Sequence, residues 1–410
     1  MNKRKKTIKA VPPYIHPGYL NFKLAPFEAW KRLGGDVAKS HYPPKCLHGA
    51  AFRWELPTLW KSKKEARLRF VEPVSLFFDT FPDYARYEVV PMFWDCWPCY
   101  FEKTCEWLCR HQVKTAIFSS LQTAEMMQER FSGENKGWKR INVIWCPEAV
   151  DDSVYQKGKL LKDRNIDLLE FGRSNDKVFK ADQLKSVFDN KNRNLNHVCT
   201  KQNGKFIYTN KQLYEAMGNA KVTIALPRSI TQPEIAGDIE TLTQRYWECM
   251  FSRIVMVGHA PQELIDFIGY NPVIELTDKI SAEELIADVI EHVEDYQALV
   301  DKNRETAEKN KSGNGRDQIA EKDLLHRGHI SGQPDEQGHQ RKEKGRAENA
   351  ENAERALAAL FRCMQCYHSR KIYTKSLYTL CQGGGDLTNI SRCDIVCIAV
   401  RYIAARYIMW

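Results

Sequence analysis

No stretch of this 410-residue chain approaches the roughly 18 consecutive apolar residues that a membrane-spanning helix needs. No apolar segment follows the basic run Lys3-Arg4-Lys5-Lys6 either, so we expect no secretory signal and a cytoplasmic protein. The 13 cysteines are too scattered for a small secreted disulfide framework, and we expect them to stay reduced. Apolar residues make up 43% of the chain, which excludes a wholly disordered protein.

Charge is unevenly distributed along the chain. The net charge of +9 comprises +12 in residues 1–70, −8 in residues 71–310 and +5 in residues 311–410. A basic N-terminal portion could face nucleic acid, acidic lipid headgroups or a phosphate-linked substrate, or it could be a solvated surface that aids solubility. The sequence contains no recognisable DNA- or RNA-binding motif, so we predict no nucleic-acid partner.

Strands and helices alternate in two separate runs. The first run has predicted strands at Arg67–Glu72, Glu88–Phe93, Lys114–Ser119 and Ile141–Trp145, and helices at Phe101–His111 and Leu121–Phe131. The second run has predicted strands at Ile166–Phe171, Lys205–Thr209, Lys221–Leu226, Ile254–Val257 and Pro272–Glu275. Its predicted helices are Ala181–Asn190, Lys211–Asn219, Leu242–Phe251, Pro261–Ile268 and a long one from Ala282 to about Glu308.

This alternation indicates βαβ crossovers and parallel sheets. We therefore predict an α/β protein with two doubly wound, Rossmann-like domains facing a cleft, plus an irregular C-terminal tail. The predicted domains are residues 1–160, which open irregularly with one short helix near Phe27–Leu33, and residues 161–310. Residues 311–410 form a polar linker and a tail of uncertain fold. Ligands of this architecture bind at the carboxyl ends of the strands, so the cleft is the expected site.

Two glutamates follow the strand that ends at Pro227-Arg228-Ser229. Glu240 precedes a predicted helix, and Glu248 lies about seven residues into it, roughly 10 Å along the axis at about 1.5 Å per residue. Thr241 with Gln244 would form a capping box, which places the helix start just after Glu240. Two carboxylates so spaced could contact both ends of one elongated ligand with a diphosphate between them, or they could be surface glutamates of a helix.

A second candidate loop is Phe171-Gly172-Arg173-Ser174-Asn175-Asp176-Lys177, after the first strand of the second run. Glycine permits a close approach of backbone to ligand, Arg173 can bind phosphate bidentately, and Lys177 can add a point charge. An ordinary solvated loop is the alternative. His259, after a third strand, is more typical of a loop histidine than of a catalytic one.

The order of these motifs resembles the nucleotide-sugar half of GT-B glycosyltransferases, most of all the retaining, group 1 (GT4-like) families. The resemblance covers about residues 140–310. It implies that Arg173 and Lys177 bind the donor diphosphate, that Glu240 lies against the donor sugar as the catalytic candidate, and that Glu248 binds the nucleotide ribose. We also assign Gly172 and Ser229, at the two strand ends, to the donor site.

The resemblance implies sugar transfer with retention from a nucleoside-diphosphate sugar to a glycan or lipid-linked acceptor, in polysaccharide or lipopolysaccharide synthesis. It implies no cofactor and no metal, and the basic N-terminal portion would add peripheral contact with an anionic membrane. The family places glycines after the first glutamate, where this chain has Thr241-Leu242-Thr243. Asp238 is therefore an alternative to Glu240, and a non-catalytic nucleotide-sugar-binding or scaffold protein is the alternative function.

Cysteines and one aspartate complete the candidates. Cys96, Cys99, Cys105 and Cys109 could hold zinc or act as a redox pair, or could be structural thiols. A second weak zinc pattern joins Cys363, Cys366, His368 and Cys381. Asp95 follows a predicted strand at the edge that faces the cleft, in a catalytic or a structural role.

Overall fold

The computed structural model describes residues 7–14, 23–32, 34–43, 45–49, 55–57, 61–62, 64–132, 140–173, 176–202 and 205–311. The chain divides into Met1–His368 and Ser369–Trp410, and every described residue belongs to the first unit. The predicted tail and its cysteine pattern therefore lie outside the described residues. None of the described helices is both long enough and apolar enough to cross a bilayer.

The first lobe is built on a parallel five-stranded sheet in the order β1-β2-β3-β4-β5. Its strands are β1 (Thr7–Ala10), β2 (Glu65–Val71), β3 (Glu88–Phe93), β4 (Thr115–Phe118) and β5 (Asn142–Trp145). Its helices are α1 (Leu24–Arg32), α3 (Leu76–Thr80), α4 (Asp83–Arg86), α5 (Pro98–Arg110) and α6 (Leu121–Arg130).

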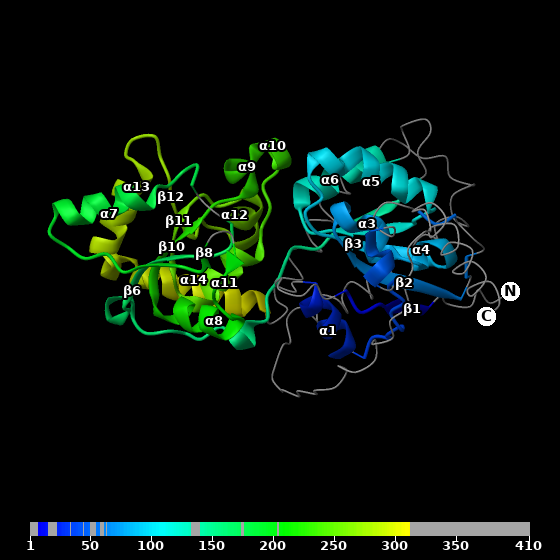
Figure 1. The fold of residues 1–410 in the computed structure, drawn as a ribbon, viewed down its shortest axis with the longest axis horizontal. Coiled ribbons are helices and arrows are strands. Elements are labelled where there is room, and N and C mark those ends of the chain that lie inside the picture. The colour runs from blue at the N-terminus through cyan, green and yellow to red at the C-terminus, as the bar shows by residue number, and fades with distance from the viewer. Residues whose placement is uncertain are drawn as a thin grey trace, which may run out of the picture. The chain divides into compact units, whose positions relative to one another are not determined.

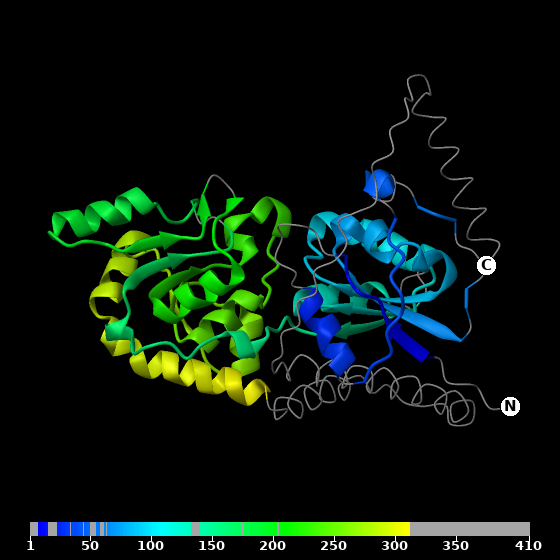
Figure 2. The ribbon, with the colours of Figure 1, turned by 60° about the horizontal axis from the view of Figure 1, so that its bottom comes forward.

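Helices cover both faces of this sheet because its buried strands carry apolar side chains on both sides. In β3, Val90 and Met92 pack with α1 on one face, whereas Val89 and Phe93 pack with α4, α5 and α6 on the other. Figures 1 and 2 both show α1 on the side of the sheet opposite to α5 and α6.

The second lobe holds a second parallel five-stranded sheet, in the order β12-β11-β10-β6-β7. Its strands are β6 (Ile166–Glu170), β7 (His197–Cys199), β10 (Ala220–Ala225), β11 (Val255–Gly258) and β12 (Val273–Glu275). Its helices are α7 (Ala181–Asn190), α8 (Asn210–Asn219), α9 (Arg228–Thr231), α10 (Pro233–Ala236), α11 (Gln244–Ser252), α12 (Gln262–Ile268), α13 (Ala282–Glu291) and α14 (Gln297–Lys311).

Short 3-10 helices occur along the whole described chain, at Lys45–Leu47, Pro73–Ser75, Asp152–Val154, Leu161–Asp163 and Val293–Tyr296.

Alternate side chains of this sheet also supply two cores. In β11, Val255 and Val257 pack with α7 and α13, whereas Met256 packs with α8 and α11 on the opposite face (Figure 1). The predicted fold class, α/β with two parallel sheets covered by helices, is confirmed.

Three local predictions are wrong. The opening residues are not all irregular, because β1 pairs with β2 across more than 50 positions of sequence, a contact that no local pattern reveals. The predicted strand Lys205–Thr209 is only β9 (Lys205–Phe206), which pairs with β8 (Lys201–Gln202) in a two-stranded hairpin, and the sheet strand is β7 instead. The predicted long helix is broken by the 3-10 turn Val293–Tyr296.

Candidate functional site

The strand order of the second sheet reverses between β6 and β10, which are neighbours in the sheet. Ligands of open α/β sheets bind at the carboxyl ends of strands at such a reversal. The residues that follow β6 and β10 are Gly172-Arg173 and Pro227-Arg228-Ser229. The fold therefore places two of the loops chosen from the sequence at one edge of the sheet, at the reversal point.

Arg173 is a half-buried cation that no carboxylate of the described residues contacts directly. It forms no hydrogen bond or ion pair with any residue that the structure describes, and its Nε is fully enclosed. Burial lowers the pKa of Arg173 to about 10 and the neighbouring Arg245 lowers it further, whereas the charges of Asp95 and Glu148 oppose this shift without cancelling it. A buried charge is costly unless an opposite charge compensates it, so this guanidinium marks a site for an anion.

Arg245 is the second cation of the site, and the sequence analysis missed it. Its guanidinium carbon lies 5.4 Å from the centre of the Phe171 ring. Burial lowers the pKa of Lys201, and the positive charges of Arg245 and Arg173 lower it further. Arg245 stands three positions before Glu248 in α11 and so shares its helix face, which is the signal that could have identified it.

Gly172 makes room for Arg245. The glycine has φ +81°, and a Cβ built on it would lie 2.0 Å from an Nη atom of Arg245. The sequence analysis assigned this space to a ligand, whereas in the structure the guanidinium occupies it.

Replacing Gly172 by alanine should therefore displace Arg245 and weaken binding of a nucleoside diphosphate about tenfold. One charge-assisted hydrogen bond contributes roughly 1.5–3 kcal/mol, and tenfold corresponds to about 1.4 kcal/mol. Gly269→Ala is the matched control, because Gly269 has φ +82° but nothing within 4 Å of the added Cβ. Calorimetric titration of both variants checks this, and equal losses would assign the effect to backbone strain alone.

Lys177 lies away from this cluster. Its side chain is 58% exposed, and its Nζ lies 3.2 Å from a carboxylate oxygen of Glu234 in α10. Of the two predicted diphosphate ligands, Lys177 thus pairs with an exposed glutamate, whereas Arg173 has no directly bonded carboxylate among the described residues.

Glu248 faces the segment that links the lobes. Its Oε1 accepts a hydrogen bond from the Tyr155 hydroxyl at 2.8 Å, and no described residue donates to its other oxygen. Burial raises the pKa of Glu248, and the Tyr155 hydrogen bond and the charge of Arg245 oppose that shift. A carboxylate with one oxygen available can accept a ligand hydroxyl.

Glu240 is linked to two titratable side chains, His259 just after β11 and Glu275 at the end of β12. Its Oε1 lies 2.9 Å from Nε2 of His259, and Nδ1 of His259 lies 2.8 Å from Oε2 of Glu275. Burial lowers the pKa of His259, but Glu275 and Glu240 outweigh it and the net shift is upward. Asp238, the alternative to Glu240, is exposed and pairs with no described residue.

Ser229 and Arg228 occupy the short helix α9. The Oγ of Ser229 is enclosed and has no hydrogen-bond partner among the described residues. The Arg228 guanidinium lies 3.5 Å from a carboxylate oxygen of Asp95 and 5.2 Å from the centre of the Trp97 ring. Arg228 therefore joins the second lobe to the first, a role that the sequence analysis did not assign.

Asp95 lies just beyond β3 and has a left-handed backbone, with φ +52°. Aspartate tolerates this conformation better than most residues, and it aims the side chain out of the strand's direction. Burial raises the pKa of Asp95, whereas the charges of Arg173 and Arg228 oppose the shift. Its carboxylate keeps 40% of its surface exposed, so it can accept a proton from a ligand.

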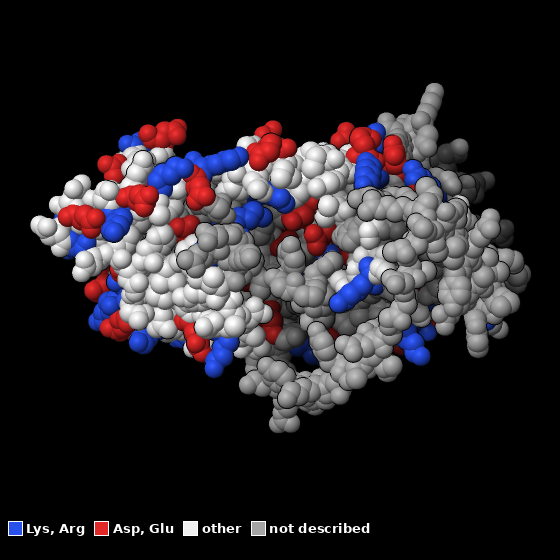
Figure 3. All heavy atoms as spheres, in the orientation of Figure 1, with Lys and Arg blue, Asp and Glu red and all other residues white. Residues whose placement is uncertain are grey.

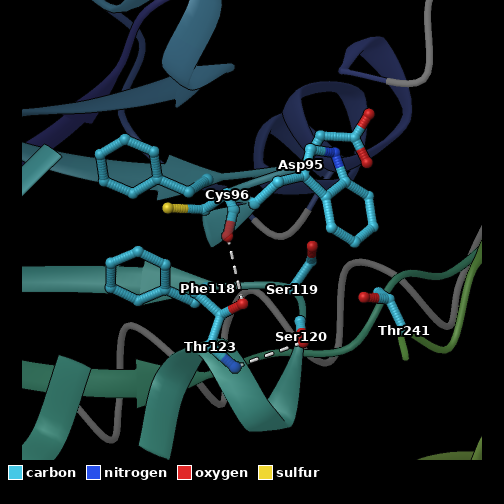
Figure 4. Close-up of a pocket in the computed structure, with 9 residues that line it drawn as sticks. Asp95, Cys96, Phe118, Ser119, Ser120, Thr123 and Thr241 are labelled. Atoms are coloured by element: carbon cyan, nitrogen blue, oxygen red, sulfur yellow. Dashed lines mark hydrogen bonds between the residues drawn. The ribbon is translucent and has the colours of Figure 1, made fainter. Parts of the chain in front are cut away.

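A small pocket opens beside Asp95. It is lined by Phe93, Asp95, Cys96, Trp97, Phe118, Ser119, Ser120, Thr123 and Thr241. Figure 4 shows the Ser119 and Thr241 side chains around the same hollow as Asp95. Thr241 Oγ1 is enclosed and lacks a partner. The pocket lining combines aromatic rings with hydroxyl groups and one carboxylate.

The predicted capping box at Thr241 is wrong. Helix α11 begins at Gln244, its N-cap Thr243 makes no side-chain cap, and the Gln244 N–H donates to Glu148 at 3.1 Å. Glu148 follows β5 in the linking segment, and burial raises its pKa to about 8. A carboxylate of the linking segment therefore takes this N-terminal amide.

Glu263 in α12 fastens the two lobes. Its carboxylate accepts from the Trp145 indole at 2.9 Å and the Leu121 N–H at 3.3 Å, both in the first lobe. It also accepts from the Leu242 N–H at 3.3 Å in its own lobe. Burial raises the pKa of Glu263 to about 7.

The cysteines of α5 do not converge. Cys105 packs its sulfur 3.6 Å from that of Met127, Cys96 lies 3.9 Å from the Thr104 hydroxyl, and Cys99 is exposed. Within the described ranges, no three His, Cys, Asp or Glu side chains gather to hold a metal ion. The zinc alternative for this helix is therefore not supported.

Charge on the visible face of the second lobe is mixed. Figure 3 shows basic and acidic side chains interspersed there, with no patch of one sign. We therefore expect an anion to bind at the cluster of Arg173, Arg245 and Lys201 rather than on this face.

No family model matches the chain, and no curated protein matches it in sequence. Several solved structures are similar in fold. Anabaena HepE in complex with UDP and glucose is 10% identical, with a TM-score of 0.46, covering 78% of this chain and 100% of that one. T4 phage β-glucosyltransferase is 11% identical with a TM-score of 0.40, covering 78% and 99%. Similarity at this level carries no weight for function, which must follow from the side chains of this chain.

Proposed function

We propose that this protein is a glycosyltransferase that moves a sugar from a nucleoside-diphosphate sugar to a hydroxyl of a glycan or lipid-linked acceptor. The observation that carries the proposal is Arg173, whose guanidinium lies at the reversal point of the second sheet with an enclosed Nε and no directly bonded carboxylate among the described residues. A diphosphate would supply the missing negative charge. Arg245 and Lys201 add positive charge beside it.

The carboxylates on either side suit the rest of such a donor. Glu248 has one oxygen available to accept a ribose hydroxyl and acts electrostatically on Arg245. Glu240, held by His259, is the group we assign to the sugar. Gly172 and Ser229 belong to the donor site by position, and Lys177 contributes only if its loop moves toward the diphosphate.

In the reaction, the bond between the anomeric carbon and the diphosphate oxygen breaks, and a bond to the acceptor oxygen forms. Negative charge grows on the departing diphosphate, where Arg173 and Arg245 stabilise it. We propose retention of configuration, as in the group 1 (GT4-like) families that the sequence resembles, with the acceptor proton passing to the departing diphosphate.

Asp95 supports a second stereochemical course. Its carboxylate could take the acceptor proton as a general base from the first-lobe pocket, and attack from that side would invert the anomeric carbon. The anomeric coupling constant of the product, measured by NMR, separates the two courses. An inverted product together with an activity loss of about 1000-fold in Asp95→Asn would replace retention by inversion.

Non-catalytic binding is the second candidate function. It is favoured by Thr241-Leu242-Thr243, which stand after Glu240 where the resembled family has glycines. Thr241 and Leu242 are buried, and the Thr241 side chain lines the pocket and occupies space that a glycine would leave open. Calorimetry separates the candidates, since a catalyst transfers or hydrolyses the donor whereas a binding protein only retains it. Synthesis of cell-surface polysaccharide at the inner face of the membrane is the setting we propose, on the basis of the +12 charge of residues 1–70.

Donor binding is tested by a thermal-shift screen of UDP-, GDP-, ADP- and CMP-sugars. We expect one nucleotide class to raise the melting temperature and the others to leave it unchanged. Wild-type protein should bind the ribonucleotide of that class about tenfold more tightly than its 2′-deoxy form, because Glu248 accepts from the ribose.

Glu248→Gln should reduce this preference for the ribonucleotide, while Glu215→Gln, an exposed change on α8, should preserve it. A chain that binds no nucleotide sugar in the screen would contradict the proposed function.

A further inference from the structure

The linked side chains Glu275, His259 and Glu240 come from three separate parts of the second lobe. Glu275 ends β12, His259 follows β11, and Glu240 lies in the loop before α11. Strands β11 and β12 are paired, with Gly258 opposite Glu275. The sheet therefore fixes the imidazole against the inner carboxylate, and only the outer one, Glu240, sits on a loop.

Glu275 is held firmly on its own side. Its Oε1 accepts from the Ala260 N–H at 2.9 Å and from the Asn271 amide at 2.7 Å, while Oε2 faces Nδ1 of His259 at 2.8 Å. A carboxylate with three partners cannot rotate freely. It fixes the ring orientation of His259 and directs Nε2 toward Glu240.

The backbone adds a further restraint on His259. Its N–H donates to the Ala225 carbonyl at 2.9 Å, and its own carbonyl accepts the Tyr246 hydroxyl at 2.7 Å. Tyr246 stands next to Arg245 in α11, and the charges of Arg245, Glu240 and Arg173 all act on its hydroxyl. The imidazole is thus tied to the same part of the lobe as the cation cluster.

Glu240 keeps capacity for a ligand. Besides His259, it accepts only the Gln262 N–H, at 3.3 Å, from the described residues, and its side chain is 26% exposed. A carboxylate has about four acceptor sites, so at least one remains for a hydroxyl group. Without His259, the loop carboxylate would lose its strongest partner and sample other rotamers.

We propose that His259, clamped by Glu275, is a positioning residue that holds the Glu240 carboxylate against the sugar of the donor. The inference rests on the proposed function. It assigns the side chains of Glu275, His259 and Glu240 to the sugar alone. Arg173 and Arg245 would bind the diphosphate, and Glu248 would bind the ribose.

The test compares a nucleoside diphosphate with its sugar conjugate, for example UDP with UDP-glucose, chosen as the pair that wild-type protein binds in the screen. The ratio of the two dissociation constants measures how much the sugar adds to affinity. His259→Ala should lower this ratio about tenfold and change the dissociation constant of the diphosphate less than twofold. A purely structural role of His259 would weaken both ligands equally.

His197→Ala is the matched control, since His197 pairs with Glu170 at 2.8 Å in the same lobe but on the edge strand β7. It should leave the ratio unchanged. Glu275→Gln keeps the shape of the side chain while removing its charge, and it should lower the ratio of the dissociation constants about threefold. This variant tests the inference even if His259→Ala does not fold.

Equal losses for both ligands, or an unchanged ratio in both His259→Ala and Glu275→Gln, overturn the inference while the proposed function stands. Wild-type protein that binds no nucleotide sugar overturns the proposed function, and the inference with it.

Discussion

Replacing Arg173 by alanine is expected to weaken binding of the nucleoside diphosphate by about 100-fold. Two charge-assisted hydrogen bonds from one guanidinium contribute roughly 3 kcal/mol, which corresponds to a little over 100-fold in affinity. The guanidinium has no directly bonded carboxylate among the described residues, so its charge is available to the ligand. Calorimetric titration measures the loss directly.

The ligand-free variant should be no less stable than wild type. Burial and the neighbouring arginines outweigh the charges of Asp95 and Glu148 at Arg173, so the cation costs free energy and Arg173→Ala removes that cost. Its melting temperature in the absence of ligand should therefore stay the same or rise. A lower melting temperature would indicate a structural role for Arg173 and would contradict the assignment to an anion site.

Lys177→Ala provides the comparison, because the sequence treats Lys177 and Arg173 as equivalent. Lys177 is largely exposed and pairs with Glu234, so we expect less than a threefold change in affinity. Equal losses from both variants would mean that ligand binding draws Lys177 to the phosphates.

Replacing Glu263 by alanine should lower the free energy of unfolding by about 3 kcal/mol, at roughly 1 kcal/mol for each of three hydrogen-bond donors left without an acceptor. For lobes of this size, that corresponds to a fall of roughly 6–12 °C in melting temperature. Asp266→Ala, an exposed change in the same helix, should have little effect.

The loss of stability in Glu263→Ala should also depend on pH. Burial raises the pKa of Glu263 from 4.5 to about 7, so between these values the folded protein holds a proton that the unfolded chain releases. The contribution of Glu263 to stability is therefore greatest below about pH 4.5 and declines as the pH rises through 7. Melting curves at pH 5 and pH 8 should show a larger deficit at pH 5, and a deficit that grows with pH would contradict the burial of this carboxylate.

Most of the second lobe could be predicted because its signals are local. The strand before Gly172 and the strand before Pro227 are mostly apolar and are followed by turn residues, and helix Ala181–Asn190 was predicted at its observed bounds. The first strand and β7 were missed because short edge strands depend on pairing with distant residues.

The candidate site divides in the same way. Gly172, Arg173, Ser229, Glu240 and Glu248 could be selected because they follow strands or stand on one helix. Glu148 could not be selected, and Arg245 offered only its place on the Glu248 face of the helix, because the contacts of both arise only when α11 lies against the end of β6 and against the linking segment. The capping box failed for the same reason, since a carboxylate nearly 100 positions away replaced the local hydroxyl.

The sequence by itself determined the α/β alternation, the two runs and the loops that carry polar residues, because period, propensity and turn chemistry act over a few neighbouring residues. Only the tertiary structure decided which charges meet. Arg173 gathers with Arg245 and Asp95 rather than with Lys177, and Glu240 pairs with His259. Electrostatic partners are set by distance in space, which the order of residues along the chain does not contain.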